Sequence, residues 1–86
     1  MKETEKILKA LANHRRLAIV KYLEKSGRSS VGDISDHIKL SFKATSKHLG
    51  ILRNVDILDR EQIDLTMNYS LSKPIHSIIK VTLSTL

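Results

Sequence analysis

Apolar residues recur at helical spacing through the N-terminal part of the chain. In residues 3–12 a narrow stripe of Ile7, Leu8 and Leu11 stands among Glu and Lys, which predicts an amphipathic helix. Asn13 can cap a second helix, which is predicted over residues 14–25. Its apolar set is broader and comprises Leu17, Ala18, Ile19, Val20, Tyr22 and Leu23. Because apolar residues cover more than one face of this second helix, we expect it at the centre of the hydrophobic core.

Two further helices are predicted by capping residues as well as by apolar spacing. Ser30 followed by Asp33 has the spacing of a capping box and begins a short third helix. Ser41 can cap a fourth helix that runs to about Arg53. The inward face of this fourth helix is predicted from the residues Thr45, Leu49 and Leu52. A turn of about three residues joins the two helices, so residues 30–53 predict a helix-turn-helix.

A β-hairpin and a last helix are predicted after the fourth helix. Residues 57–62 and 65–71 are typical of paired strands, the second because apolar and polar residues alternate cleanly along it. Together they predict a β wing over residues 57–71. Pro74 suits the first turn of a helix, and an apolar stripe follows it, so residues 74–86 predict a terminal helix.

The order of these elements predicts a mainly α-helical protein with a two-stranded β wing, which is the winged helix-turn-helix architecture. We expect residues 1–86 to form a single domain, because chains this short rarely divide into two cores. A core of this size is only marginally stable alone. The chain has no cysteine, so oligomerisation rather than a disulfide is expected to reinforce it.

The charge distribution favours a polyanionic partner. Lys and Arg number 15 against 9 Asp and Glu, which gives a formal net charge of +6 and suits nucleic acid. No acid lies between Asp36 and Asp56, whereas lysines, histidines and Arg53 gather there. With two Tyr, one Phe and no Trp, the chain has too few rings to stack single-stranded bases, so we expect duplex DNA. A face that is merely solvated is the alternative interpretation of the same charges.

The residues expected to contact DNA lie in the fourth helix and at its cap, and they are Ser41, Phe42, Lys43, Ser46, Lys47, His48 and Arg53. Lys43, Ser46 and Lys47 are expected at base edges in the major groove, and Lys47 suits the O6 and N7 atoms of guanine. Ser41, His48 and Arg53 are expected to hold phosphates, with a structural role as the alternative for His48. Phe42 either packs against the core or contacts a thymine methyl group.

Several segments of the chain resemble motifs of the ArsR-type winged-helix repressors. Ala10–Leu17, with the sequence A-L-A-N-H-R-R-L, looks like the A-L-A-[DN]-x-x-R-L opening of that family. From Leu40 to Arg53, the run L-S, then S-K-H-L, then L-R is similar to the family's recognition helix, and Tyr69-Ser70-Leu71 is similar to the end of its wing. The resemblance spans roughly residues 8–71 and implies a dimeric repressor that binds DNA.

The family's metal-sensing motifs are missing from this chain. Where some members carry a C-x-C pair in the third helix, this chain has Ser30 and Gly32. A site that other members build on the last helix from Asp, His and Glu is also missing, because no acid follows Asp64 and His76 is the only histidine there. We therefore expect no metal and no cofactor within one chain, and a metal site shared by histidines of two subunits is the alternative. The wing tip, Glu61-Gln62-Ile63-Asp64, also lacks the Gly and Arg that are usual in the family.

Two polar side chains near the expected core need partners. Arg16, which matches the arginine of the family motif, is expected to pair with an acid such as Glu24 or Asp56, or to reach a phosphate. Thr45 stands where the family usually has a β-branched apolar residue, so it keeps that shape but adds a hydroxyl that needs a hydrogen-bond partner.

The two terminal helices carry more apolar surface than a monomer of this size can cover, which predicts a homodimer. The expected interface residues are Ile7, Leu8 and Leu11 at one end and Ile75, Ile78, Ile79, Thr82, Leu83 and Leu86 at the other. The resemblance implies the same pairing of residues 3–12 and 74–86. No apolar run is long enough to cross a membrane and the start is not that of a signal peptide, so we expect no membrane partner and a cytoplasmic location.

These features predict a sequence-specific transcriptional regulator, a dimeric repressor that occupies an inverted-repeat operator through the helix of residues 41–53. The sequence identifies no inducer. A protein–protein interaction module is the rival from another class, favoured by the acidic wing tip and the missing metal sensor. A sequence-tolerant chromosomal DNA-binding protein is a third alternative. An enzyme is not expected, because the chain has neither a G-x-S-x-G nucleophile motif nor a glycine-rich phosphate loop.

Overall fold

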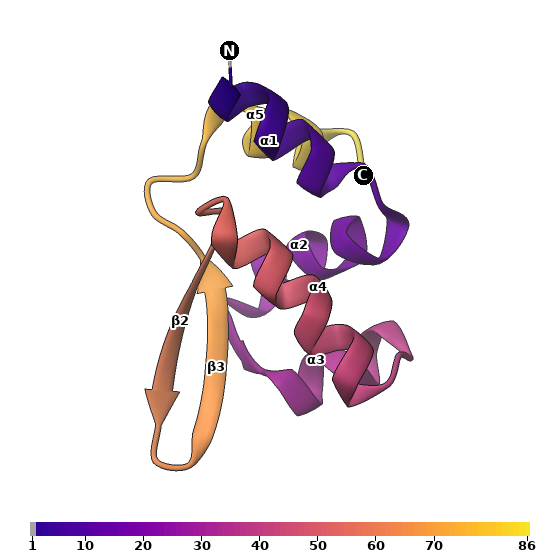
Figure 1. Cartoon of the computed structure of the whole chain (residues 1–86), viewed down its shortest axis with the longest axis vertical. Helices are drawn as coiled ribbons and strands as arrows, with labels where there is room; N and C mark the ends of the chain where they lie inside the picture. Colours follow the sequence, from indigo (N-terminus) through magenta and orange to yellow (C-terminus); the bar gives the residue numbers. More distant parts are fainter. Residues whose placement is uncertain (1) are drawn as a thin grey trace.

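The computed structural model describes residues 2–86, which form five helices and three strands (Figure 1). The elements, in chain order, are α1 (Lys2–Leu11), α2 (His14–Ser26), β1 (Arg28–Ser30), α3 (Val31–Ile38), α4 (Phe42–Asn54), β2 (Leu58–Ile63), β3 (Thr66–Leu71) and α5 (Ser77–Ser84). The α3–α4 pair is the predicted helix-turn-helix, and the β2–β3 hairpin is the predicted wing.

Polar caps fix where three of the helices begin, as the sequence predicts. Asn13 Oδ1 accepts hydrogen bonds from two backbone N–H groups in the first turn of α2, at 2.9 and 3.1 Å. Ser30 Oγ accepts from the Asp33 N–H at 3.1 Å, and Ser41 Oγ accepts from the third residue of α4, also at 3.1 Å. Each cap satisfies a backbone donor that the helix itself cannot pair, so these boundaries follow from local chemistry.

The wing hairpin is joined by a third strand that the sequence analysis does not predict. The sheet is antiparallel in the order β1-β3-β2, and Ser29 of β1 lies opposite Tyr69 of β3. Three residues are too few to show an alternation pattern, and two of them are serines, which do not favour strands. The prediction of a two-stranded wing therefore missed β1, which forms only because β3 offers it a free edge.

The hairpin turn lies one residue further along than expected. Ile63 pairs with Thr66, which leaves Asp64 and Leu65 as the turn between β2 and β3. Asp64 adopts a left-handed backbone with φ 55°, a conformation that aspartate tolerates in tight turns. Leu65, expected to begin the second strand, instead sits at the tip with 97% of its surface exposed.

The core lies between α2, α4 and the inner face of the sheet. Ile19 and Val20 of α2 are fully buried, as the sequence predicts for the central helix. Thr45, Leu49 and Leu52 of α4 are also fully buried, which confirms the predicted inward face of this helix. Packing of this face fixes which residues of α4 point to solvent.

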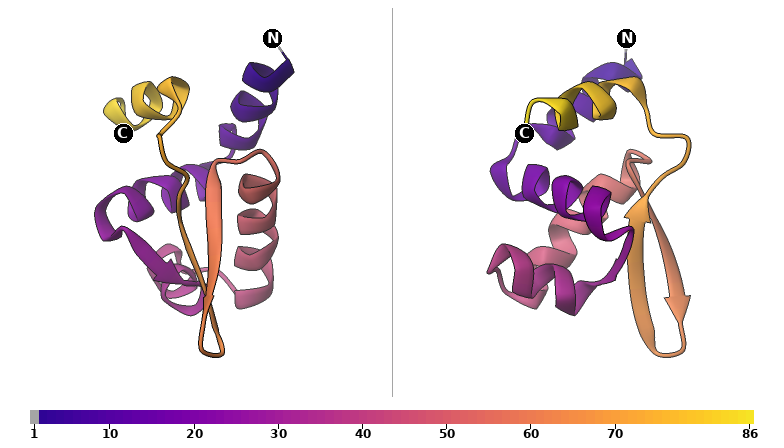
Figure 2. Two further views of the ribbon diagram at one scale, coloured as in Figure 1. Left: turned by 90° about the vertical axis from the view of Figure 1, so that its left-hand side faces the viewer. Right: turned by 180° about the vertical axis from the view of Figure 1, so that it is seen from behind.

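The last helix begins later than the sequence predicts. Its first residue is Ser77 rather than Pro74, because His76 acts as the N-cap and its Nδ1 accepts a hydrogen bond from the Ile78 N–H at 3.1 Å. Helices α1 and α5 contact each other at the end of the molecule away from the wing tip (Figure 2). Within residues 2–86, no helix is long and apolar enough to cross a membrane.

Packing of the two terminal helices changes the set of residues available to a second copy. Ile7, Leu11 and Ile79 are 3%, 4% and 2% exposed within the single chain. These three residues, expected at a dimer interface, therefore belong to the chain's own core. Helical spacing identifies one apolar stripe on each helix, but it does not say which part of the stripe the chain itself covers.

Candidate nucleic-acid interface

Helix α4 presents a polar and cationic face to solvent, opposite its buried face. Lys43, Lys47 and Arg53 are exposed along it. Ser46 and Gly50 are half-buried between them, and a Cβ atom added at Gly50 would meet nothing within 4 Å. Small residues between long cationic ones leave the backbone of the helix accessible. Such a helix can enter a groove about 12 Å wide, the width of the DNA major groove.

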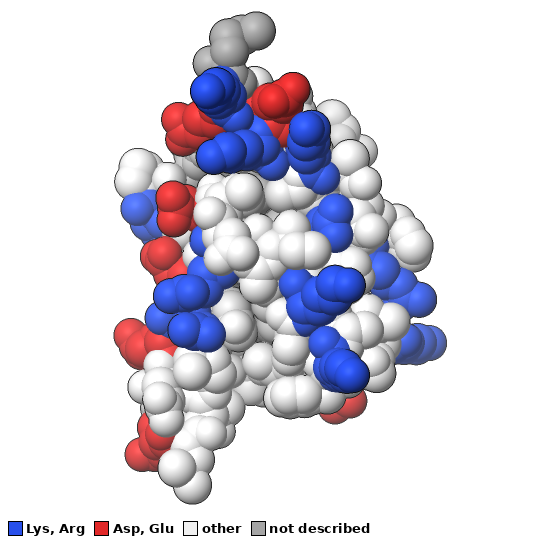
Figure 3. Space-filling view, viewed as in Figure 1, with Lys and Arg blue, Asp and Glu red and all other residues white. Residues whose placement is uncertain are grey.

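Charges of opposite sign are separated on the surface that includes α4 and the wing. No acid occurs from residue 37 to residue 55, so the whole of α4 and the turn before it are free of carboxylates. Asp59 and Glu61 lie on β2, and Asp64 lies at the wing tip. In Figure 3 blue side chains lie over the centre and right of this face. Red side chains lie along its left edge, where β2 runs, next to further blue ones, and others lie at the top and at the lower end of the face. A polyanion would therefore be attracted to α4 and repelled by the wing.

Phe42 is the first residue of α4, and its side chain is 62% exposed. Of the two interpretations drawn from the sequence, packing against the core is wrong. The helical angle of Phe42 is close to that of Leu49, which suggested burial. The core, however, ends at Thr45, one turn further into the helix, so an aromatic ring at the first helical position projects beyond it.

Ser41 caps α4 through its hydroxyl, which accepts from a backbone N–H in the first turn, and its side chain is exposed to solvent. His48 is half-buried and receives a hydrogen bond from Arg16, whose Nη1 atom lies 3.2 Å from His48 Nδ1. The structural interpretation of His48 therefore has direct support. Ser41 and His48 border the cationic face that carries Lys43, Lys47 and Arg53, so all the residues expected to contact DNA lie on or beside one helix.

The pairing of Arg16 with an acid, which was expected from the sequence, does not occur. Its Nε atom donates to the carbonyl of Ala10 at the end of α1, and its Nη1 atom contacts His48 of α4. Neither Glu24 nor Asp56 bonds to it. The unpaired carbonyl at the end of a helix is an acceptor that no sequence motif reveals, which is why the prediction was wrong.

The pKa of His48 is lowered, first by burial and then by the positive charges of its neighbours Arg16, Arg15 and Lys47 and by His14. A neutral imidazole with its proton on Nε2 can accept the Arg16 hydrogen bond at Nδ1, which agrees with the direction of this shift. His48 therefore joins α2 to α4 as a neutral acceptor.

Arg15 is a second arginine with a structural role that the sequence analysis missed. Its Nη1 atom donates to the carbonyl of Ile38 at 2.8 Å, which ties the start of α2 to the end of α3. Together with Arg16, it holds the helix-turn-helix against the rest of the core. These two arginines contribute to the net charge but have their donors directed at backbone or imidazole acceptors.

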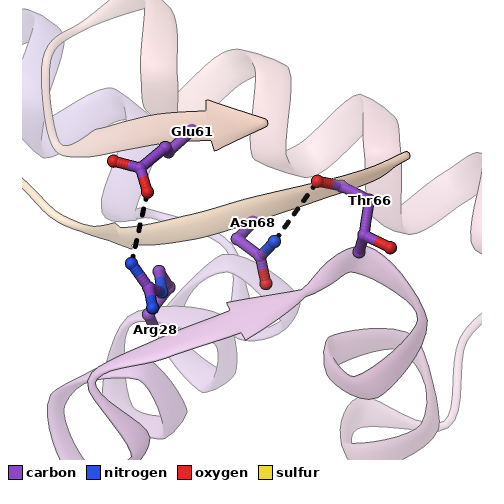
Figure 4. Close-up of polar contacts among 4 residues, drawn as sticks. All are labelled: Arg28, Glu61, Thr66 and Asn68. Atoms are coloured by element: carbon purple, nitrogen blue, oxygen red, sulfur yellow. Dashed lines mark hydrogen bonds and ion pairs between the residues drawn. The ribbon is translucent and has the colours of Figure 1, made fainter. Parts of the chain in front are cut away.

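The wing carries its own polar contacts and no cation at its tip. Arg28 of β1 forms an ion pair with Glu61 of β2 at 3.2 Å (Figure 4). The pair is exposed, so it contributes at most about 1 kcal/mol. Next to it, the Asn68 amide donates to the carbonyl of Thr66 at 3.3 Å. The wing tip ends in Asp64 and Leu65, so it offers no arginine or lysine to a DNA groove.

Among residues 2–86, no three His, Asp or Glu side chains gather closely enough to hold a metal ion. Two of the histidines make other contacts. His37 stacks on Tyr22 with ring centroids 4.2 Å apart, and His76 caps α5. These side chains are spread over α3 and the start of α5 and do not converge on one another.

Comparison with known proteins agrees with this arrangement. The model of the bacterial regulatory protein family arsR matches residues 13–60, which run from the cap of α2 into β2 and include the whole helix-turn-helix. The chain belongs to the arsR family. Members of this family are transcriptional regulators that bind DNA through a winged helix, in agreement with the expectation that the chain is not an enzyme.

Two relatives are similar to this arsR-family chain over most of its length. The transcriptional activator HlyU of Vibrio cholerae is 39% identical over 66 residues, which are 77% of this chain and 60% of HlyU. The structure of HlyU from Vibrio cholerae superimposes with a TM-score of 0.83 over 98% of this chain and 87% of HlyU, at 32% identity. The transcriptional repressor PagR of Bacillus anthracis gives a TM-score of 0.80 at 32% identity, over 93% of this chain and 92% of PagR.

A third solved structure shares the fold at lower identity. The winged helix-turn-helix domain of Mb0332 from Mycobacterium bovis, described as homodimeric, has a TM-score of 0.86 at 20% identity, over 98% of this chain and 75% of that domain. At this identity the likeness concerns the fold alone. The fold match covers α1 and α5 as well as the helix-turn-helix, so the terminal helices belong to the shared architecture.

Proposed function

We propose that this chain is a dimeric, sequence-specific repressor of transcription that occupies an inverted-repeat operator in duplex DNA. The observation that carries the proposal is the face of α4, which exposes Lys43, Lys47 and Arg53 on the second helix of a helix-turn-helix and is free of carboxylates. In this architecture the second helix lies in the major groove with its N-terminal residues at base edges.

The residues of α4 divide by their positions along the helix. Lys43 and Lys47, in the N-terminal half, lie one turn apart on the exposed face, and we assign them to base edges, with Lys47 on guanine. Ser46 is small enough to let the helix approach the bases. Arg53, in the last turn of α4, is assigned to one phosphate. The backbone near Ser41, at the other end of the helix, is assigned to another phosphate. His48 is assigned to orienting α4 through its Nδ1, which accepts from Arg16, and its Nε2–H is left to donate to a phosphate.

We propose that two copies meet along α1 and α5. Three apolar side chains of these two elements and the C-terminus are exposed, namely Leu8 at 51%, Val81 at 65% and Leu86 at 45%. Val81 was not expected from the sequence, because it lies beside the predicted stripe rather than on it. Ile75, Ile78, Thr82 and Leu83, which were expected at the interface, are half-buried, and all but Thr82 pack against the chain's own core. The homodimeric Mb0332 domain supports such a pairing in this fold.

Repression rather than activation is part of the proposal, and the relatives include both. HlyU is a named activator and PagR a named repressor. Blocking a promoter requires only occupancy, which such a protein can supply.

The experiment that tests the proposal is selection of bound sequences from a random duplex pool, followed by affinity measurements on variants. An enriched inverted repeat with half-sites about 34 Å apart supports the proposal. Lys47→Ala should lose about 1–3 kcal/mol of discrimination at one base pair per half-site. Arg53→Ala should weaken binding to all sequences alike and lower the salt slope by about one per subunit. Equal losses for both variants on selected and scrambled duplexes would point to a sequence-tolerant DNA-binding protein instead.

A protein–protein interaction module is the second candidate, and one observation favours it. The wing edge combines the carboxylates Asp59, Glu61 and Asp64 with the fully exposed Leu65, a surface that suits a basic protein better than DNA. Absence of binding to any duplex at low salt would favour this candidate over the repressor.

A further inference from the structure

We propose that Phe42 reads the 5-methyl group of a thymine in the major groove and is a specificity-determining residue of the operator contact. The inference rests on the proposed DNA-binding function and adds a base preference to it. The observation behind it is a large aromatic side chain, 62% exposed, at the first position of the DNA-reading helix.

Phe42 has no structural role that would explain its presence. It is absent from the group of apolar side chains that pack against the core, although its chain neighbour Leu40 belongs to that group. The start of α4 does not depend on it either, because Ser41 caps the helix through the Ala44 N–H. An exposed phenyl ring at a position that requires neither burial nor capping is available to a partner.

The charges around Phe42 favour DNA as that partner. Lys39 and Lys43 are exposed on either side of it, and Lys47 lies one turn beyond Lys43. No carboxylate occurs within the turn before α4 or within α4 itself. An apolar patch for another protein would be expected among apolar neighbours, whereas a single ring in a segment with three exposed lysines suits a polyanion that also offers an apolar group.

The major groove offers one such group at base edges, which is the C5-methyl of thymine. N-terminal residues of a recognition helix reach base edges, and Phe42 is the first residue of α4. Ser46 lies one helical turn from Phe42 and is small, so the ring has room to lie along the floor of the groove. Lys43 would then contact the neighbouring bases or phosphates, and the thymine would fall at the edge of each half-site that the start of α4 meets.

The test uses the duplex enriched from a random pool and replaces its thymines one at a time by deoxyuridine, which removes the 5-methyl group and leaves base pairing intact. At one position per half-site the wild-type chain should bind the deoxyuridine duplex about fourfold more weakly, the effect of one buried methyl group. Phe42→Ala should bind the thymine and deoxyuridine duplexes equally at that position. Phe42→Leu, which keeps an apolar side chain, should retain part of the preference.

Two controls separate this contact from general effects. Lys47→Ala should lose affinity but keep the thymine preference, because its effect is on another base. Phe42→Ala should unfold at the same temperature as the wild-type chain, since the ring is not part of the core.

A deoxyuridine ratio of one at every thymine, or an equal thymine preference in the wild type and Phe42→Ala, would overturn the assignment of Phe42 while leaving the proposed function in place. Failure of the wild-type chain to bind any duplex would overturn the proposed function itself, and this inference with it.

Discussion

Replacing Thr45 by valine should stabilise the protein. Thr45 is fully buried in the inward face of α4, and its Oγ1 atom has no hydrogen-bond partner among residues 2–86. The carbonyl of Ser41, one turn earlier, already accepts the Thr45 backbone N–H at 2.9 Å. The side-chain hydroxyl therefore keeps the cost of leaving water without the gain of a protein hydrogen bond.

The magnitude follows from the chemistry of the exchange. A buried hydroxyl without a partner costs about 1–3 kcal/mol in protein mutational series. Valine has nearly the same shape and helix propensity as threonine, so other contributions to the free energy of unfolding change little. We expect Thr45→Val to raise the free energy of unfolding by about 1–2 kcal/mol. For a domain of this size, each kcal/mol corresponds to a rise in Tm of about 4–8 °C.

The assay is urea unfolding of the wild type, Thr45→Val and Thr45→Ser at one fixed protein concentration, because a dimer's stability depends on concentration. Thr45→Ser keeps the hydroxyl and removes only the methyl group, so it should lower stability by about 1 kcal/mol. DNA affinity should not change in Thr45→Val, since this side chain faces inward. A valine variant that is no more stable than the wild type would refute the argument that the hydroxyl is an unpaired cost.

Three further predictions follow from the other contacts. Because the pKa of His48 is lowered in the folded chain, chiefly by burial, the unfolded chain binds the proton more tightly; stability should therefore fall as the pH drops below about 7 towards 5, and His48→Gln should flatten that part of a urea-unfolding pH series. Leu8→Asp should give monomers in sedimentation experiments without loss of helicity, whereas Ile79→Ala, in the chain's own core, should cost about 2–5 kcal/mol in unfolding experiments. Asp64→Lys at the wing tip should strengthen binding to every duplex and steepen its salt dependence by about one per subunit, and unchanged affinity at two salt concentrations would show that the tip lies away from DNA.

Most of the fold could be predicted because local signals and tertiary packing agree. Asn13, Ser30 and Ser41 cap helices at the positions that the sequence indicates, and the inward face of α4 follows from helical spacing alone. The exceptions depend on distant partners or on competing local signals. Strand β1 exists only through its pairing with β3, and at the start of α5 the capping side chain of His76 prevails over the preference of proline for a first turn.

The candidate site was predictable where one helix determines it and less so where several elements meet. Periodicity placed Lys43, Lys47 and Arg53 on the exposed face of α4. The same periodicity left Phe42 ambiguous, because the angle of a residue around the helix does not reveal where the core ends along it. Arg16 was assigned wrongly because its acceptors are a backbone carbonyl and an imidazole, and neither carries the negative charge by which a sequence reveals the partner of an arginine.

The bonds of Arg16 bear on how two recognition helices would be spaced in a dimer. Its guanidinium joins the last turn of α1, through Ala10, to α4, through His48. In a dimer formed along α1, a large rotation of that helix relative to α4 would break at least one of these bonds. The distance between the two DNA-reading helices would then depend on the hydrogen bonds of Arg16 to Ala10 and His48 rather than on a loop.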